Sequence, residues 1–304
     1  MIAPHLNPGD TIGIIAPAGP ITEAQLRGAE GKIEHAGFRA LSADNTLNRH
    51  GYLAGSDEDR ATQINSMFAN PDVKAIICAR GGYGTTRILD LLDYDLIARN
   101  PKIIGGYSDI TALTMAIWKK TNLVTFHSSM LVPEDTGYTR TSMWNIFGNG
   151  KKGTRILCEP GTADGVIMRP GHARGTLIGG NLTLLEQLIG TQYDYSLHNK
   201  ILFVEEINEP PYKVDRMLTH LRNSKNLSGL KGIVFGKMQG CEAQGDNSLS
   251  LDEVLTDFVS GLNIPVVKDF SFGHVKSRCT LPVGAKVSLR TDKMEIRLLE
   301  DVVA

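Results

Sequence analysis

The sequence is poor in the residues that bind metals or form disulfides. Only four of its 304 residues are cysteines, and no two of them have C-x-x-C spacing. They are Cys78, Cys158, Cys241 and Cys279. This spacing indicates neither a zinc site nor a disulfide framework, so we expect buried free thiols in a reducing compartment.

The sequence also lacks an excess of charge and any long apolar run. It has 32 Lys and Arg residues against 33 Asp and Glu residues, a net charge of -1, so no nucleic-acid partner is indicated. The first ten residues lack the features of a signal peptide, and no apolar run approaches the length needed to span a bilayer. We therefore expect a cytoplasmic protein with no membrane partner.

Strand and helix patterns alternate along the first half of the chain. Apolar runs at 11–16, 73–79 and 103–106 are separated by segments with helical spacing, and a further helix is expected over 85–93. This alternation predicts a parallel sheet, whereas the second half reads as mixed α and β. We expect an N-terminal α/β domain over 1–150, a glycine-rich linker over 151–174 and a C-terminal domain over 175–304.

The stretch from Ile103 to Ile110 presents a serine where a strand gives way to a helix. Ser108 follows two glycines and precedes an apolar helical pattern, which is a good position for a nucleophile because helix N-H groups point toward it. An ordinary helix N-cap has the same appearance, and Ile110 replaces the second glycine of the G-x-S-x-G pattern. The stretch alone leaves both interpretations open.

A second glycine loop, over 80–84, follows the preceding strand. Because ligands bind at the carboxyl ends of strands in open α/β sheets, this loop and Ser108 are expected to line one crevice. A phosphate cradle is the alternative, but neither G-x-x-x-x-G-K-[ST] nor G-x-G-x-x-G is present.

A serine nucleophile needs a base, and the base needs an acid that fixes its tautomer. Glu205 and His274 each follow an apolar strand, as Ser108 does, and the order Ser, acid, His is that of the α/β hydrolases. Each also has a structural alternative, an ion pair for Glu205 and a loop role for His274. His127, near another strand end, is the competing histidine.

Several blocks together resemble the L,D-carboxypeptidases, the muramoyltetrapeptide carboxypeptidase family of serine peptidases, which also contains microcin C self-immunity peptidases. The resemblance covers nearly the whole chain, with the blocks in order. They are Arg80 to Gly84, Gly106 to Asp109, Gly179 to Leu182, Val204 to Glu209 with Tyr212 and Asp215 to Leu218, and Phe272 to His274 followed by Thr280 to Ala285.

The resemblance implies a triad in which Ser108 is the nucleophile, His274 the general base and then acid, and Glu205 the residue that orients the imidazole. It further implies an oxyanion hole made by the backbone N-H of Asp109 and that of Gly81 or Gly82. The implied fold is a flavodoxin-like or amidotransferase-like parallel-sheet domain plus a smaller C-terminal mixed α/β domain.

The implied reaction removes the terminal D-alanine that follows meso-diaminopimelate in murein tetrapeptides, during cytoplasmic peptidoglycan recycling. No metal or cofactor is required, and family members are often homodimers. A substrate that ends in a carboxylate needs a cation, for which Arg80 is our choice, and Asn181 is a candidate for binding the peptide backbone.

Two alternatives differ in substrate or in class. A microcin-type peptidase or amidase would act on aminoacyl-nucleotide analogues with the same triad, but it would need an aromatic platform for the base. The two tryptophans, Trp118 and Trp144, lie outside the recognised blocks. A non-catalytic peptide- or nucleotide-binding module would use the glycine loops as a cradle, and it would not need Glu205 and His274 to converge on Ser108.

Overall fold

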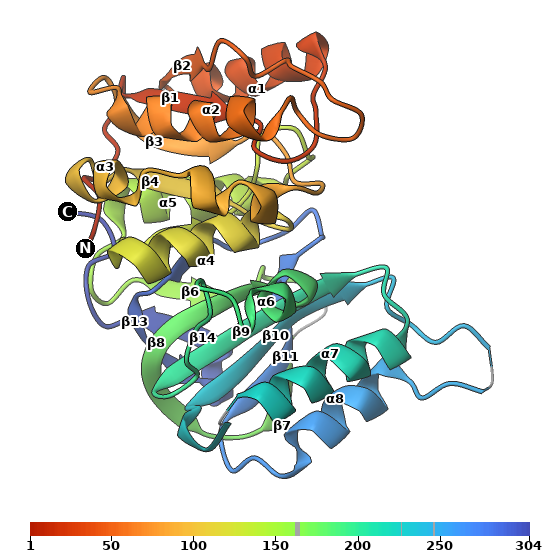
Figure 1. Cartoon of the computed structure of the whole chain (residues 1–304). Coiled ribbons are helices and arrows are strands. Elements are labelled where there is room, and N and C mark those ends of the chain that lie inside the picture. Colours follow the sequence, from red (N-terminus) through yellow and green to blue (C-terminus); the bar gives the residue numbers. More distant parts are fainter. Residues whose placement is uncertain (162–164, 226, 246) are drawn as a thin grey trace.

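Two β-sheets, with helices packed on and between them, make up the molecule (Figure 1). The computed structural model describes residues 1–161, 165–225, 227–245 and 247–304. The two termini lie close together, and the Ala304 N-H donates to the Ala3 carbonyl at 2.8 Å. No helix in these described ranges has the length and apolar character that crossing a bilayer requires.

The first sheet contains five strands of the N-terminal half and β12 from near the C-terminus, in the order β12-β5-β4-β3-β1-β2. Its first five strands in sequence run parallel, as their buried apolar runs predict, and β12 pairs antiparallel with β5. All carboxyl ends of the parallel strands therefore lie at one edge. The strands are β1 (Thr11–Ile15), β2 (Arg39–Ser42), β3 (Val73–Cys78), β4 (Ile103–Gly106), β5 (Thr125–His127) and β12 (Leu281–Val283).

Capping boxes at Thr22 and Ser56 begin the first two helices of this half. The helix expected over 85–93 is wrong, because two short 3-10 helices, η1 (Thr85–Arg87) and η2 (Leu89–Leu91), replace it. Thr85 N-H donates to the Asp109 carboxylate, so a tertiary contact fixes this backbone. The helices are α1 (Glu23–His35), α2 (Asp57–Ala69), α3 (Tyr94–Arg99), α4 (Ile110–Thr121) and α5 (Gly137–Asn149).

The second sheet is mixed, with strand order β6-β14-β13-β8-β9-β10-β11-β7. Strands β8 to β11 are parallel, and antiparallel strands flank them on both sides. Helices α7 and α8 lie side by side on one face (Figure 1). The strands are β6 (Arg155–Leu157), β7 (Val166–Arg169), β8 (His172–Asn181), β9 (Lys200–Ile207), β10 (Gly232–Gln239), β11 (Val266–Gly273), β13 (Lys286–Arg290) and β14 (Glu295–Leu298); the helices are α6 (Leu182–Leu188), α7 (Pro211–Ser224), η3 (Leu227–Gly229), α8 (Leu251–Ser260) and η4 (Thr291–Lys293).

The predicted α/β class is confirmed, but the segment 151–174 is not a free linker. It contains β6 and β7, which pair with β14 and β11 at the two edges of the second sheet. Edge strands that are partly exposed and only three or four residues long leave no periodic signal, which explains why the sequence does not predict them. Residues 162–164 of this segment lie outside the described residues. The division into two domains stays a prediction.

The two halves meet where α4 packs against the end of β8. The backbone N-H of Asn181 donates to Thr111 Oγ1 at 3.0 Å, within the first turn of α4. Gly180 has φ of +148°, and a Cβ built there would lie 2.4 Å from the Thr111 side chain. A glycine is therefore required for the halves to approach this closely.

We predict that Gly180→Ala lowers the free energy of unfolding by about 2–4 kcal/mol, from overpacking together with an unfavourable φ. Urea unfolding measures this change. The control is Gly28→Ala in α1, where a Cβ meets nothing within 4 Å, and which should gain about 0.5–1 kcal/mol. Equal stabilities for the two variants would contradict the close contact.

Candidate active site

Ser108 lies at a strained turn between β4 and α4. Its φ is +64°, in the left-handed region that non-glycine residues seldom adopt. The N-cap of α4 is Asp109, and no side chain caps this end of the helix. The N-cap interpretation of Ser108 is therefore wrong. With the described residues the Ser108 hydroxyl forms no hydrogen bond, which leaves it available to a substrate.

The glycine loop after β3 lies directly against the serine. A Cβ built on Gly81 would stand 3.0 Å from Ser108 Cβ and 3.2 Å from its Oγ, so a larger residue would crowd the serine. Gly82 has φ of +132°, and the Gly81 carbonyl accepts from the Gly19 N-H at 3.2 Å. The loops that follow β1, β3 and β4 thus meet at one edge of the sheet, as predicted from their topology.

The side chain of Asp109 ties the serine turn to the glycine loop. Its Oδ2 accepts from the Thr85 N-H at 2.9 Å, and the Thr85 hydroxyl donates to its backbone carbonyl at 2.5 Å. Burial raises the pKa of the Asp109 carboxyl, and the Thr85 hydrogen bonds oppose that rise. The buried carboxyl therefore holds the turn, while the Asp109 N-H stays at the start of α4.

Glu205 and His274 form a hydrogen-bonded pair at the carboxyl ends of β9 and β11. His274 Nδ1 lies 2.7 Å from Glu205 Oε2, and Glu205 is completely buried. Gly273 has φ of +108°, and a Cβ there would lie 3.0 Å from the Glu205 Cβ, so glycine permits the pairing. With Nδ1 held by the carboxylate, the second ring nitrogen is left for proton transfer.

Aromatic contacts connect this pair to the serine turn. The ring of Tyr107, the residue before Ser108, meets the His274 ring edge-on with centroids 5.1 Å apart. The buried His127 ring contacts the rings of Tyr107, Phe203 and Phe272, which precede the three proposed triad residues in the chain by one or two positions. The structure thus brings the Glu205–His274 pair up to Tyr107, the residue before Ser108.

His127 itself is suited to a structural role, packing against the neighbouring aromatic rings, rather than to proton transfer. Burial lowers its pKa to about 4, and its Nε2 has no hydrogen-bond partner among the described residues. A histidine that stays neutral throughout the working pH range of most enzymes is a poor general base. This favours His274 over His127 as the base.

The structure places the two predicted substrate-binding residues differently. Arg80 is half-buried, with its Nε donating to the Gly81 carbonyl at 3.2 Å, and lines a cavity with Arg49, Tyr52 and Tyr83. Asn181 is buried, and its amide caps α6 and donates to Glu206 Oε1 at 2.9 Å. Asn181 therefore holds the structure together at this position.

The neighbouring carboxylates of β9 have different environments. Glu206 faces the start of α6 and accepts hydrogen bonds from Asn181, Thr183 and the Ile207 N-H. Burial raises the pKa of the Glu206 carboxyl, and these bonds oppose the rise. Successive side chains of a strand point to opposite faces of the sheet. Glu206 therefore bonds to the start of α6, while Glu205 contacts His274.

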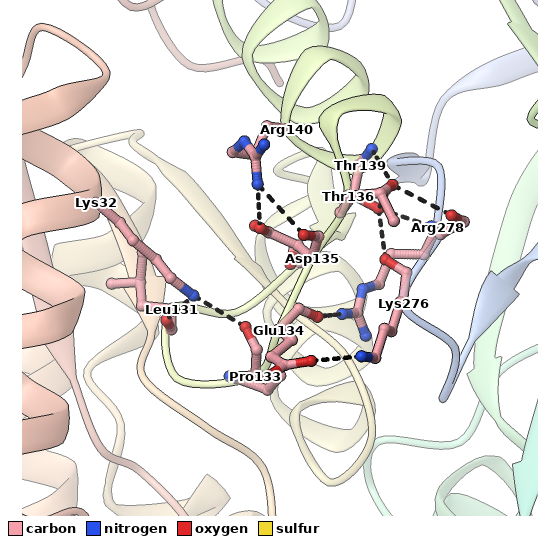
Figure 2. A network of polar contacts seen from close by, with 12 residues as sticks. Lys32, Leu131, Pro133, Glu134, Asp135, Thr136, Thr139, Arg140, Lys276 and Arg278 are labelled. Carbon is pink, nitrogen blue, oxygen red and sulfur yellow. Dashed lines mark hydrogen bonds and ion pairs between the residues drawn. The ribbon is translucent and has the colours of Figure 1, made fainter.

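A polar cluster that the sequence does not reveal lies beside His274. Arg278 lies over the Tyr107 ring, with its guanidinium carbon 4.7 Å from the ring centroid, and donates to the Glu134 carbonyl at 2.5 Å. Lys276 pairs with the Glu134 carboxylate, as Figure 2 shows. These contacts connect the loop before α5 to the loop after β11. No motif in the sequence singles these residues out.

Ser108 lies at a strained strand-to-helix turn, and the preceding Tyr107 contacts a histidine that is paired with a buried carboxylate. Serine hydrolases use these three residue types together. No group of His, Cys, Asp and Glu side chains within the described residues has the arrangement of a metal site. The further assignment comes from comparison with known proteins.

The family models for the LD-carboxypeptidase N-terminal and C-terminal domains match residues 12–128 and 174–289. The chain is 39% identical to a probable murein peptide carboxypeptidase of Bacillus subtilis over 94% of this chain and 90% of the relative. The muramoyltetrapeptide carboxypeptidase structure from Oxalobacter formigenes is 33% identical with a TM-score of 0.84, covering 97% and 100% of the two chains. The Escherichia coli microcin C7 self-immunity protein MccF, in complex with aspartyl sulfamoyl adenosine, is 28% identical with a TM-score of 0.90, covering 100% of both chains.

The chain therefore belongs to the LD-carboxypeptidase family, and it is a serine carboxypeptidase. The resemblance drawn from the sequence blocks is confirmed. An enzyme is accordingly favoured over a non-catalytic binding module.

The strain at Ser108 gives a test of the turn. We predict that Ser108→Gly is about 1 kcal/mol more stable than Ser108→Ala, because glycine adopts a positive φ without the penalty that a Cβ brings. Thermal or urea unfolding measures the difference. Ser66, on the exposed side of α2, is the control, since glycine there should be less stable than alanine by about 1 kcal/mol. The same order of stability at both sites would contradict the strained turn.

The lowered pKa of His127 predicts a pH-dependent stability. Its pKa lies below the unfolded value of 6.5, so the unfolded chain binds the extra proton and stability is lost as pH falls from about 6.5 to 4. The loss amounts to about 3 kcal/mol between pH 7 and pH 4. His127→Phe should lose that much less over the same range, measured by urea unfolding at both pH values. Parallel profiles for the two proteins would exclude a neutral buried His127.

Proposed function

We propose that this carboxypeptidase removes the terminal D-alanine from murein tetrapeptides, cleaving after meso-diaminopimelate, in cytoplasmic peptidoglycan recycling. The observation that carries the proposal is the buried Glu205–His274 pair, whose imidazole contacts Tyr107, the residue before the strained Ser108. The names of the relatives, a murein peptide carboxypeptidase and a muramoyltetrapeptide carboxypeptidase, support the substrate class.

In the proposed reaction, Ser108 Oγ attacks the carbonyl carbon of the scissile bond while His274 takes its proton. Glu205 accepts the hydrogen bond from Nδ1 and stabilises the imidazolium that forms. The developing oxyanion is held by the N-H of Asp109 and that of Gly81 or Gly82, and the N-terminus of α4 adds a favourable dipole. The close approach of Gly81 to Ser108 supports this role for the glycine loop.

Collapse of the tetrahedral intermediate breaks the C-N bond, and His274 gives its proton to the leaving amine of D-alanine. A water molecule, deprotonated by His274, then attacks the acyl-serine carbonyl. The second collapse releases the shortened peptide and returns the proton to Ser108. All these steps use side chains and N-H groups of this chain.

A second candidate function is a microcin-type peptidase or amidase that acts on aminoacyl-nucleotide analogues. The exposed side chains of Tyr52 and Tyr83 favour this function. Their rings lie 5.8 Å apart in the cavity that Arg49 and Arg80 also line. Aromatic rings beside cations can hold a base and an anionic group. Trp118 and Trp144 offer no such platform, because Trp118 packs near Gly284 and Trp144 against Phe38.

The test is mass spectrometry of a murein tetrapeptide incubated with wild type and with triad variants. Wild type should release one alanine, and Ser108→Ala, His274→Ala and Glu205→Gln should each lose about 10⁴-fold or more in rate. The matched control is Glu206→Gln, the neighbouring carboxylate that faces α6, which should stay within a few-fold of wild type.

The outcomes separate the two candidate functions. Wild type that leaves the tetrapeptide intact but cleaves an aminoacyl sulfamoyl adenosine would favour the second function and retain the triad. Full activity in the Glu205→Gln or His274→Ala variant would remove those residues from the mechanism.

A further inference from the structure

Arg278 is a buried cation without a carboxylate partner. Its residue surface is 3% exposed, and the ion pairs of the described residues do not include it. Its Nη2 donates to the Glu134 carbonyl, and its Nε is buried with no hydrogen-bond partner among the described residues. Burying an uncompensated charge is costly. A buried arginine without a carboxylate partner is therefore expected where a bound anion compensates its charge.

Among the described residues, the other arginine buried to this degree is Arg60, whose charge has a carboxylate partner. Arg60 is fully buried, and it pairs with Asp57 while its Nη1 donates to the Pro17 and Gly84 carbonyls, each at 2.8 Å. The Nε atoms of both arginines are buried without a hydrogen-bond partner among the described residues, but Arg60 has a carboxylate and two carbonyls, whereas Arg278 has one carbonyl and the face of Tyr107. Arg278 is therefore the cation that has room for an additional anionic partner.

Arg278 also lines the cavity that contains the His274 side chain. This cavity of about 430 Å³ is lined by residues of the two loops whose contacts Figure 2 shows, Glu134 and Lys276 among them, together with Tyr107 and Gln239. Its size is within the usual range for small-molecule sites. A ligand there would contact the proposed base and the buried guanidinium at once.

The remaining charges around the cavity leave Arg278 uncompensated. Lys276 and the Glu134 carboxylate pair with each other at the rim, where both side chains are more than 70% exposed. Glu205 lies behind His274 and is hydrogen-bonded to it. The buried positive charge on the cavity wall is thus that of Arg278.

The chemistry of the leaving group determines which anion belongs there. His274 gives its proton to the amine of the departing D-amino acid, and the terminal carboxylate is attached to the same α-carbon as that amine. The carboxylate must therefore lie beside the imidazole. We propose that Arg278 binds the terminal carboxylate of the substrate and so selects peptides with a free C-terminus; this rests on the proposed carboxypeptidase function.

The proposal revises the choice of Arg80 made from the sequence. Arg80 lines a separate cavity, which shares no wall residue with the one at His274 and lies beside Gly82 and Tyr83. A cation there is placed to meet a group of the substrate other than the one that departs next to His274. Meso-diaminopimelate and the residues before it carry further carboxylates for such a contact.

The experiment compares a murein tetrapeptide ending in D-alanine with the same peptide ending in D-alaninamide. Wild type should prefer the acid in kcat/KM by about 10- to 100-fold, the effect of a charge-assisted hydrogen bond. Arg278→Met should lose that factor on the acid, mainly in KM, and change little on the amide. Arg278→Lys should keep part of the preference.

Two control variants separate carboxylate binding from a structural effect. Arg140→Met removes a cation of the same network that pairs with Asp135 and does not line this cavity, so it should keep the wild-type preference. Arg80→Met should also keep it. The proposal is wrong if Arg278→Met slows both substrates equally, or if Arg80→Met abolishes the preference instead.

Binding to the Ser108→Ala protein, measured by calorimetry, keeps this inference distinguishable from the reaction. The acid peptide should bind about 10- to 100-fold more tightly than the amide, and the Ser108→Ala, Arg278→Met double variant should bind both alike. If wild type cleaves neither peptide but this difference persists, the carboxylate site stands and the proposed reaction fails. If the acid and amide bind equally in the presence of Arg278, the carboxylate site is refuted.

Discussion

The geometry of the site depends on the contact between Thr111 and Asn181. Thr111 lies one turn after Ser108 in α4, and the Asn181 N-H bonds to its hydroxyl. Asn181 is also the residue that pairs in register with Glu205 across β8 and β9. This hydrogen bond, which the missing side chain of Gly180 makes possible, therefore links the helix that follows the serine in one half to the strand pair that carries the carboxylate in the other. Because cleft sites are sensitive to small displacements, this contact has consequences for catalysis as well as stability.

Around that contact, local hydrogen bonds and close glycine contacts hold the polar groups of the site. The left-handed Ser108 is held by the Asp109–Thr85 hydrogen bonds, and Glu205 is held against Gly273 and His274. Backbone strain and buried charge are therefore found at the serine and its proposed partners, while apolar side chains fill the rest of both sheets. A protein tolerates such costs where function needs them, and the surrounding core provides the compensation.

Much of this arrangement could be predicted from local patterns, because periodicity, capping boxes and glycine loops are encoded in neighbouring residues. The strands before Ser108, Glu205 and His274 were predictable for that reason. The 3-10 helices within residues 85–93 were not predictable, because a tertiary hydrogen bond from Thr85 to Asp109 fixes the backbone there. Nor was the separation of β12 from β13, adjacent in sequence but in different sheets. The role of Arg278 could not be predicted from the sequence, because its burial without a carboxylate partner results from the packing of Tyr107 and the 131–136 loop around it.

The position of Arg278 also bears on why such an enzyme would act at a chain terminus. A peptide that continued past the scissile residue would present a neutral amide to the guanidinium, leaving the buried charge uncompensated in the complex. Sites built around a buried polar partner reject ligands that lack the complementary group far more strongly than apolar pockets reject a change of size. The same arginine that completes the wall beside His274 would therefore disfavour internal cleavage. In the proposed mechanism, the residue that recognises the terminal carboxylate and the histidine that protonates the leaving amine are parts of one loop, so recognition and proton transfer are positioned together.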